Sequence, residues 1–282
     1  LLLAERGKVP AALGEVDVVL PLLHGPYGED GTVQGLLEMA GVRYVGSGVL
    51  ASAVGMDKHY MKVVLAGHGL PVGPYVTVTP RRWRTDRATV LDAVASLTFP
   101  VFVKPARGGS SLGITRVERP EDVPAAVAAA QEHDPKVIVE AGLTGRELEC
   151  AVLQGRGDDG PRTAAPGEIV VDGDPGVFYD YESKYFTQDG VTLACPAELP
   201  AEDRKGVQEM AAAAFEALGC EGLARVDFFY DAGRIVVNEV NTMPGFTPYS
   251  MYPTMWERSG LSYPELVDEL IQLALERPPG LR

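Results

Sequence analysis

The chain has 282 residues, of which 46% are apolar, and a formal net charge of -14 with no run rich in lysine and arginine. This length allows two or three domains with sizeable buried cores. The charge argues against nucleic acid or a membrane surface as the main partner, because both are anionic and would repel an acidic chain.

The cysteine pattern favours a reducing, cytoplasmic location. Cys150, Cys195 and Cys220 lie far apart and form no CxxC pair. This spacing predicts neither a disulfide framework nor a zinc site. No apolar run reaches the roughly 18 residues that a membrane-spanning helix needs. The first residue is Leu rather than Met, and we expect a further segment to precede Leu1.

Residues 1–57 are predicted to be the remainder of a parallel α/β domain. A nearly continuous apolar run predicts a strand from Val16 to His24 that is covered on both faces. A helix from Thr32 to Ala40 and a strand from Val42 to Val45 follow. The next apolar segment predicts one helix from Ser52 to Ala66.

A glycine pattern just before that helix is typical of nucleotide-binding sites. Gly46 to Ala51 fits the G-x-G-x-x-A pattern of dinucleotide-binding folds. That fingerprint requires an acidic residue about 20 positions later to bind the ribose. No Asp or Glu lies between Asp57 and Asp86, so we interpret these glycines as packing residues.

Residues 58–139 are predicted to form a small α+β lid domain with short strands and one helix. The strands are expected at residues 100–104, 114–117 and 137–140, and the helix at residues 120–131. A glycine-serine loop, Arg107 to Gly113, joins the first two strands. Its backbone N–H groups and the hydroxyls of Ser110 and Ser111 suit phosphate oxygens, with Lys104 as a nearby cation. A bare turn is the alternative interpretation of this loop.

Residues 140–282 are predicted to form the largest domain. Strands are expected at residues 148–154, 168–171, 223–230 and 234–241, and a final helix at residues 264–276. A helix from Glu202 to Leu218 carries one apolar stripe. The residues of the stripe are Val207, Met210, Ala211, Ala214, Phe215 and Leu218.

The hairpin of the last two strands carries the strongest chemical signal. Asp231-Ala232-Gly233 suits a three-residue loop that pairs Tyr230 with Arg234. Odd-numbered residues of both strands then share a face. Arg225 would lie opposite Glu239, with Asp227 diagonal to it at about 7–8 Å.

The polar residues on this shared face are Arg225, Asp227, Glu239 and Asn241. Two carboxylates and an amide are hard oxygen ligands, which suit Mg²⁺ held together with substrate phosphates. A solvated hairpin face is the alternative interpretation, and we favour the metal site because these four polar residues fall on one face.

Two motifs together resemble D-alanine–D-alanine ligases of the ATP-grasp superfamily, and the actinobacterial branch in particular. His24-Gly25-Pro26-Tyr27-Gly28-Glu29-Asp30-Gly31-Thr32-Val33-Gln34-Gly35 resembles the first signature of that family. Arg225-x-Asp227 with Glu239-x-Asn241-Thr242-x-Pro244-Gly245 resembles the second. The resemblance extends over nearly the whole chain and implies an ATP-grasp fold.

The resemblance implies roles for individual residues. Positions around ATP would be Lys58, Lys104, Glu140, Leu143 and Glu147, with Ser110 and Ser111 in a lid loop that closes on the nucleotide. The ligands of two Mg²⁺ ions, or of Mn²⁺, would be Asp227, Glu239 and Asn241.

For the substrates, the resemblance implies that Arg225 and the Gly245 amide bind the carboxylate of the first D-alanine. Ser250 and the Met251 amide would bind that of the second. His24 is assigned an active-site role through its place in the first signature.

Residues 179–185 resemble the family's mobile loop. Lys184 would point at the γ-phosphate, and Tyr185 would act with Ser110 when the second amine loses its proton. The resemblance also implies a glutamate upstream of Leu1 that binds the first ammonium group. Gly108 stands where the family often has an acid, and we expect looser lid contacts there.

The implied reaction joins two D-alanines for peptidoglycan synthesis through a D-alanyl phosphate, in a cytoplasmic homodimer. Two alternatives remain: D-lactate or D-serine as the second substrate, or a nucleotide-binding module that lacks chemistry. Tyr185 favours D-alanine over D-lactate, because relatives that use D-lactate replace this tyrosine. The intact set of Arg225, Asp227, Glu239 and Asn241 argues against a mere binding module.

Overall fold

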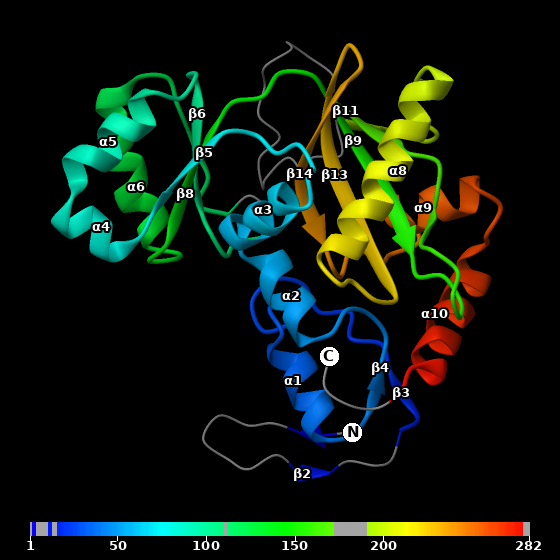
Figure 1. Ribbon diagram of the computed structural model, residues 1–282. Helices are drawn as coiled ribbons and strands as arrows, with labels where there is room; N and C mark the ends of the chain where they lie inside the picture. Colours follow the sequence, from blue (N-terminus) through cyan, green and yellow to red (C-terminus); the bar gives the residue numbers. More distant parts are fainter. Residues whose placement is uncertain (1, 4–10, 13–15, 110–111, 172–190, 279–282) are drawn as a thin grey trace.

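The fold contains two antiparallel sheets that lie side by side, with a short parallel strand pair below them (Figure 1). The computed structural model describes residues 2–3, 11–12, 16–109, 112–171 and 191–278. The first part of the chain contains β1 (Leu2–Leu3), β2 (Ala11–Ala12), β3 (Val18–Val19), α1 (Thr32–Met39), β4 (Arg43–Tyr44), α2 (Val49–Met56) and α3 (Lys58–Gly67).

A four-stranded sheet with three helices forms the left-hand part of the molecule in Figure 1. Its strand order is β5-β8-β6-β7. The elements are β5 (Tyr75–Val78), α4 (Pro80–Thr85), α5 (Arg87–Ala95), β6 (Val101–Pro105), β7 (Thr115–Val117), the 3₁₀ turn η1 (Pro120–Asp122), α6 (Val123–Gln131) and β8 (Val137–Ala141). Valines of this sheet and its helices form one core, so this part packs as a unit.

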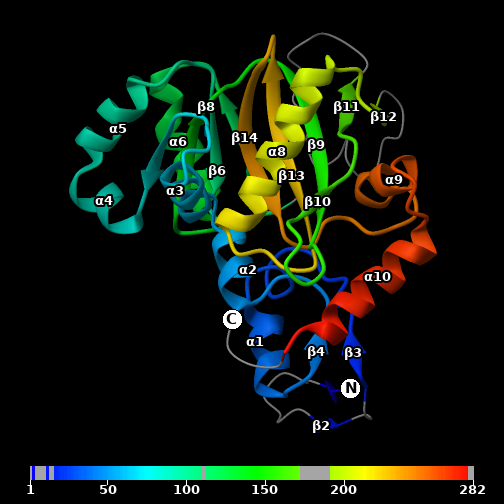
Figure 2. The ribbon, with the colours of Figure 1, turned by 45° about the vertical axis from the view of Figure 1, so that its right-hand side comes forward.

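The larger sheet has six strands in the order β12-β11-β9-β13-β14, with β10 paired to β9. Its elements are β9 (Arg146–Leu153), β10 (Arg162–Thr163), β11 (Gly167–Val171), β12 (Val191–Ala194), α8 (Ala201–Ala217), β13 (Leu223–Asp231), β14 (Arg234–Asn241), α9 (Met251–Arg258) and α10 (Tyr263–Glu276). Figure 2 shows α8 across the sheet formed by β9, β13 and β14.

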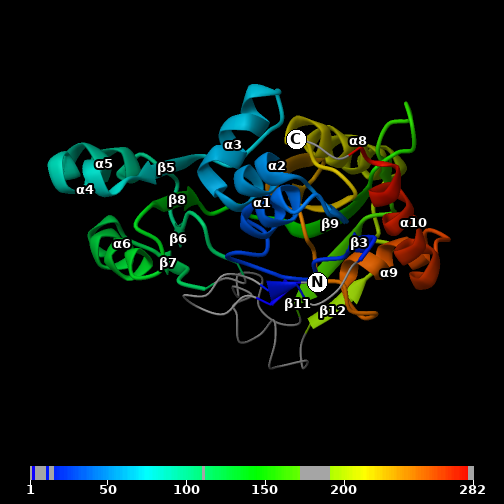
Figure 3. The same ribbon diagram turned by 90° about the horizontal axis from the view of Figure 1, so that it is seen from below.

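Two helical layers cover opposite faces of this sheet. The core under α8 contains Leu148, Cys150 and Val152 of β9, whereas the core under α9 and α10 contains Ala151 and Leu153. Even and odd positions of one strand therefore point into different cores, as the pleat requires. Figure 3 shows α8 and α9 on opposite sides of β9 and β11. The stripe predicted on α8 is confirmed, because its residues pack into the first core.

The first predicted strand is wrong in length. The apolar run from Val16 to His24 forms only the two-residue strand β3, parallel to β4. Pro21 has no N–H to donate, and the next two amides bond backward, from Leu22 to the Leu20 carbonyl and from Leu23 to the Pro21 carbonyl. The chain therefore turns away from the sheet after Val19.

The single helix predicted from Ser52 to Ala66 is also wrong, because it is two helices. Asp57 has an extended backbone between α2 and α3, and its carboxylate accepts hydrogen bonds from the amides of His59 and Tyr60. A capping aspartate that satisfies first-turn amides starts a new helix. As a result, α3 packs with Met61 and Leu65 into the core under α8.

The lid domain contains more helix than the one segment that the sequence predicts. Thr79 caps α4 by accepting a hydrogen bond from the Arg82 amide, and Pro80 occupies the first helical position. The next helix, α5, buries only Val90 and Val94. So narrow an apolar stripe gives a weak periodic signal. Every helix in the described ranges is too short or too polar to cross a membrane.

The register of the β13–β14 hairpin differs from the prediction, but its four polar residues still lie on one face of the sheet. Asp231 pairs with Arg234, so the loop has two residues instead of three. A β-bulge then shifts the register between Asp227 and Phe228, which leaves Asn238 as the extra residue on β14. Beyond the bulge, Asp227 pairs with Glu239 and Arg225 with Asn241, instead of Arg225 with Glu239.

The bulge decides which side chains of β14 face the polar side of the sheet. Val237 and Val240 both pack into the core under α8, although they are three positions apart. Without the bulge, strict alternation would point Glu239 into that core and Val240 away from it. The irregularity at Asn238 therefore brings Glu239 and Asn241 to the face of Asp227.

This register predicts different outcomes at two adjacent positions of β14. Val240→Asn should lower the free energy of unfolding by about 2–4 kcal/mol, because it buries an amide without a partner and removes apolar packing. Asn241→Val should lower it by only about 1–2 kcal/mol, because its side chain lies outside that core and the variant loses one hydrogen bond to Asp227. Urea denaturation of both variants measures the difference, and equal stability would contradict the bulged register.

Candidate active site

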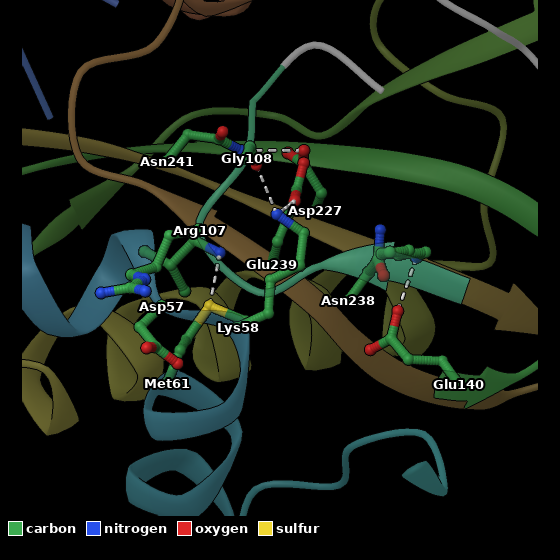
Figure 4. Close-up of polar contacts among 12 residues, drawn as sticks. Asp57, Lys58, Met61, Arg107, Gly108, Glu140, Asp227, Asn238, Glu239 and Asn241 are labelled. Carbon is green, nitrogen blue, oxygen red and sulfur yellow. Dashed lines mark hydrogen bonds and ion pairs between the residues drawn. The ribbon is translucent and has the colours of Figure 1, made fainter. Parts of the chain in front are cut away.

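The hairpin residues predicted to form the chemical site lie in contact with each other. Arg225 donates from Nε to Asp227 Oδ1 and from Nη2 to Asp227 Oδ2, both at 2.7 Å. Asn241 Nδ2 donates to the same Asp227 Oδ2 at 3.0 Å. Glu239 lies directly across the strand pair from Asp227. Figure 4 shows Asp227, Glu239 and Asn241 gathered beside Gly108. The predicted common face is confirmed.

Charge is concentrated at this site. Burial alone would lower the pKa of the Arg225 guanidinium, but Asp227 and then Glu149 raise it well above its ordinary value. Arg225 thus stays charged at every physiological pH. Two carboxylates and one amide around it fit a divalent cation, because hard cations prefer oxygen ligands. The described residues contain no group of three or more His, Cys, Asp or Glu side chains poised for a metal by themselves.

A cleft runs between the hairpin and the glycine loop of the lid. Predicted site residues from three parts of the chain line it: Lys58, Lys104, Glu147, Glu239 and Asn241. Glu29, from the first motif, and the apolar Leu112, Ile114 and Phe229 also line it. Basic groups on one side and acidic groups on the other suit a phosphate-bearing ligand that shares a metal ion with the protein.

Lys58 connects the two sides of the cleft. As the first residue of α3, it extends its ammonium group to the Gly108 carbonyl at 2.7 Å and to Glu239 Oε2 at 3.7 Å (Figure 4). One cation therefore contacts both the glycine loop and an acid of the hairpin.

Glu140, whose contact with the nucleotide remains a prediction, belongs to a buried group of three charged residues. Its carboxylate lies between two lysines, with Lys62 Nζ at 2.8 Å from Oε1 and Lys104 Nζ at 2.5 Å from Oε2. Burial acts to raise the pKa of Glu140, but Lys104 and Lys62 lower it far below its ordinary value. Only Lys104 of these three residues lines the cleft. Glu140 therefore orients Lys104 through a buried ion pair.

A second ion-pair network holds the base of the glycine loop. Lys136 Nζ contacts both carboxylate oxygens of Asp57, at 2.7 and 2.8 Å. Asp134 accepts hydrogen bonds from the amide, Nε and Nη2 of Arg107, the first residue of the loop. Although burial acts to raise the pKa of Asp134, the Arg107 hydrogen bonds lower it overall. The cap of α3 and the glycine loop are thus both fastened to the segment before β8.

The residues predicted to bind the second carboxylate lie at the start of α9. Ser250 precedes the helix, and its Oγ accepts a hydrogen bond from the Thr247 amide at 3.1 Å. Met251 is the first residue of α9, where helix geometry provides no intrahelical partner for the amide. A Cβ added to Gly245 would lie 3.1 Å from Ser250 Oγ. Gly245, Ser250 and Met251 are therefore close in space.

Three predicted residues lie apart from the cleft or beside it. His24 Nδ1 is 3.0 Å from the Met243 carbonyl, so this histidine ties the first motif to the loop after β14. Leu143 packs against Gly73 and does not line the described part of the cleft. Glu147 is exposed at the mouth of the cleft. The roles of these residues remain predictions. The predicted residues Ser110, Ser111, Lys184 and Tyr185 lie outside the described residues.

The sequence analysis missed several residues that the structure brings to the site. Glu149 of β9 is the strand partner of Asp227 and lies 3.2 Å from Arg225 Nε. The available signal was its position in the strand predicted at residues 148–154, two positions after Glu147. Glu29 lines the cleft, and burial raises its pKa although the Gly25 amide donates to it. No pattern in the sequence around Lys62 indicates its contact with Glu140.

Comparisons with known proteins agree with this geometry. A family model described as D-ala D-ala ligase C-terminus matches residues 64–272, and one described as D-ala D-ala ligase N-terminus matches residues 3–47. The chain belongs to the D-alanine–D-alanine ligase family. The resemblance seen in the two motifs is thereby confirmed.

Two relatives of this family cover all or nearly all of the chain. A D-alanine–D-alanine ligase from Arthrobacter sp. (strain FB24) is 61% identical over 283 residues, which span 100% of this chain and 74% of the relative. One from Streptomyces coelicolor is 56% identical over 284 residues, or 99% of this chain and 72% of the relative.

Solved structures confirm the expected ATP-grasp fold with its mixed α/β and α+β character. A Bacillus anthracis D-alanine–D-alanine ligase complexed with ATP has a TM-score of 0.75 and 31% identity, covering 92% of this chain and 79% of that one. The VanG D-Ala:D-Ser ligase of Enterococcus faecalis has a TM-score of 0.82 and 42% identity, covering 93% and 74%.

The buried triad of Lys62, Glu140 and Lys104 predicts a large effect of a small substitution. Glu140→Gln should lower the free energy of unfolding by about 3–5 kcal/mol at pH 7, because it leaves the two buried ammonium groups without a carboxylate partner. The lowered pKa of Glu140 adds a pH signature: its contribution is present above about pH 4.5 and is lost as pH falls toward the folded-state pKa.

Chemical denaturation between pH 3 and pH 8 measures both effects. Glu209→Gln is the matched control, since Glu209 pairs with Lys205 on the exposed face of α8 and such pairs contribute little. If Glu140→Gln were no more destabilising than the control at pH 7, the triad would not stabilise the fold.

Proposed function

We propose that the protein ligates two D-alanines to D-alanyl-D-alanine at the expense of ATP, for peptidoglycan precursor synthesis. Family membership supports this proposal at the level of the whole chain. At the level of the site, the observation that carries it is the contact of Arg225, Asp227, Glu239 and Asn241 at the edge of a lysine-lined cleft.

The nucleotide would lie in the cleft between the lid and the larger sheet. Lys58 at the start of α3 and Lys104 of the lid line the cleft and can contact phosphate oxygens, while Glu239 and Asn241 line it from the hairpin, with Asp227 beside them as the strand partner of Glu239. We propose that these three hold two Mg²⁺ ions, or Mn²⁺, together with the phosphates. Bound metal would neutralise charge on the transferred phosphoryl group.

Arg225 is proposed to orient the carboxylate of the first D-alanine, because its planar guanidinium binds carboxylates through two parallel hydrogen bonds. Attack of that carboxylate on the γ-phosphate gives D-alanyl phosphate and ADP. The amine of the second D-alanine then attacks the acyl carbon, and phosphate leaves. Arg225 and the Gly245 amide would donate to the oxyanion of this step.

The identity of the second substrate distinguishes this proposal from its nearest alternative. The similarity to the VanG D-Ala:D-Ser ligase of Enterococcus faecalis makes D-serine the relevant competitor. We propose that Ser250 and the Met251 amide bind the second carboxylate at the start of α9, where free amides and the helix dipole favour an anion. Product analysis with D-alanine, D-serine and D-lactate separates the three reactions.

We further propose a cytoplasmic homodimer. Burial raises the pKa of Cys150, and that of Cys220 to about 12, so both thiols stay protonated and unreactive in a reducing compartment. Light scattering of the purified protein tests the dimer.

The proposed reaction predicts phosphate release that depends on D-alanine and ATP. Asp227→Asn should lower the rate of this release by at least about 100-fold, because it removes a charged ligand that faces the phosphates. Asp231→Asn, the same change at the hairpin end of the same strand, should leave the rate unchanged. Phosphate release without D-alanine, or equal rates in both variants, would contradict the proposed function.

A further inference from the structure

Three acids stand in a row across the larger sheet. Glu149 of β9 is the strand partner of Asp227 of β13, and Asp227 is the partner of Glu239 of β14. Asp227 and Glu239 have proposed roles as metal ligands, whereas Glu149 has none. Its side chain is 7% exposed. A carboxylate so deeply buried needs a charged or hydrogen-bonding partner.

Arg225 lies within reach of two acids of this row. Its Nε is 2.7 Å from Asp227 Oδ1 and 3.2 Å from Glu149 Oε2. The guanidinium is 19% exposed, so it too needs an acidic partner. In this structure, Asp227 provides the shorter contact and binds Arg225 through both oxygens.

Asp227 has two roles that compete, because it is both the ion-pair partner of Arg225 and a proposed metal ligand. Both of its oxygens accept from Arg225, and Oδ2 also accepts from Asn241 Nδ2. Three of the about four lone-pair sites of this carboxylate accept hydrogen bonds already, and a divalent cation on one of its oxygens would repel the Arg225 guanidinium, so metal binding must weaken this bidentate pair. Arg225 would then lose its main partner while it is needed for the substrate carboxylate.

We propose that Glu149 is a positioning residue that retains Arg225 when Asp227 turns toward the metal. This inference rests on the proposed function, because it requires Asp227 to be a metal ligand. Glu149 approaches Arg225 from the neighbouring strand, on the side of Asp227 away from Glu239. It can therefore take over the Nε–H without entering the metal site.

Two other acids that line the cleft contact groups other than Arg225. Glu239 is the proposed second ligand and lies 3.7 Å from Lys58 Nζ. Glu29 accepts from the Gly25 amide at 2.5 Å. Glu149 is thus the acid best placed to hold Arg225 independently of the metal.

The test is Glu149→Gln, which preserves shape and removes charge. Without the second acid, Arg225 holds Asp227 more tightly, and Mn²⁺ should bind about 10–100-fold more weakly in the presence of ADP. The Michaelis constant for the first D-alanine should also rise. Electron paramagnetic resonance measures free Mn²⁺ directly, without turnover.

Glu168→Gln is the matched control. Glu168 pairs with Arg146 at 2.6 Å in the same sheet but away from the cleft, and it is 14% exposed. This variant should bind Mn²⁺ and D-alanine as the wild type does. Equal Mn²⁺ affinity in Glu149→Gln and wild type, or an equal loss in the control, would overturn the inference.

A variant pair separates a positioning role from a merely structural one. In an Arg225→Met background, Glu149→Gln should weaken Mn²⁺ binding no further, because the residue acts through Arg225. This double variant removes one positive and one negative charge, so the net charge of the cluster stays that of the wild type, and Asn241 still donates to Asp227. An additional loss in this background would overturn the inference. A wild-type protein that binds no Mn²⁺ with ADP would instead refute the proposed metal site, and the inference with it.

Discussion

The site depends on a one-residue irregularity in a strand. Two neighbouring strands can offer ligands to one cation only if those ligands project from the same face. The two-residue hairpin loop would by itself turn Glu239 toward the core under α8, and the bulge at Asn238 reverses this. Lys62 Nζ lies 3.5 Å from the Asn238 carbonyl, so the bulge is also held from α3. Core packing and ligand geometry are therefore set by the same few residues.

Buried ion pairs connect the elements that surround the cleft. Glu140 joins α3 to the lid strand β6 through Lys62 and Lys104, and Asp57 joins the start of α3 to Lys136 of the lid. Ion pairs of this kind contribute little net stability against an apolar alternative, but they fix geometry because a broken pair is costly. Lys104, which lines the cleft, is thus positioned by Glu140, which does not line it.

The sequence predicted the facing of the hairpin acids but not their pairing. Alternation along both strands marked Arg225, Asp227, Glu239 and Asn241, whereas a bulge leaves no composition signal in a single sequence. Asp57 lies inside an apolar segment that predicts one continuous helix. Its role as the cap of α3 follows only from the extended backbone at this residue. The role of Glu149 could not be predicted, because its contact with Arg225 depends on the pairing of β9 with β13, which the sequence does not show.

The row of Glu149, Asp227 and Glu239 links ligand binding to thermal stability. Like charges directly opposite each other on adjacent strands repel, and Arg225, Lys58 and Asn241 contact these acids and offset the repulsion. A bound divalent cation would add a further positive charge beside these acids. Saturation with a divalent cation and nucleotide relieves the repulsion, so the melting temperature becomes a gauge of occupancy.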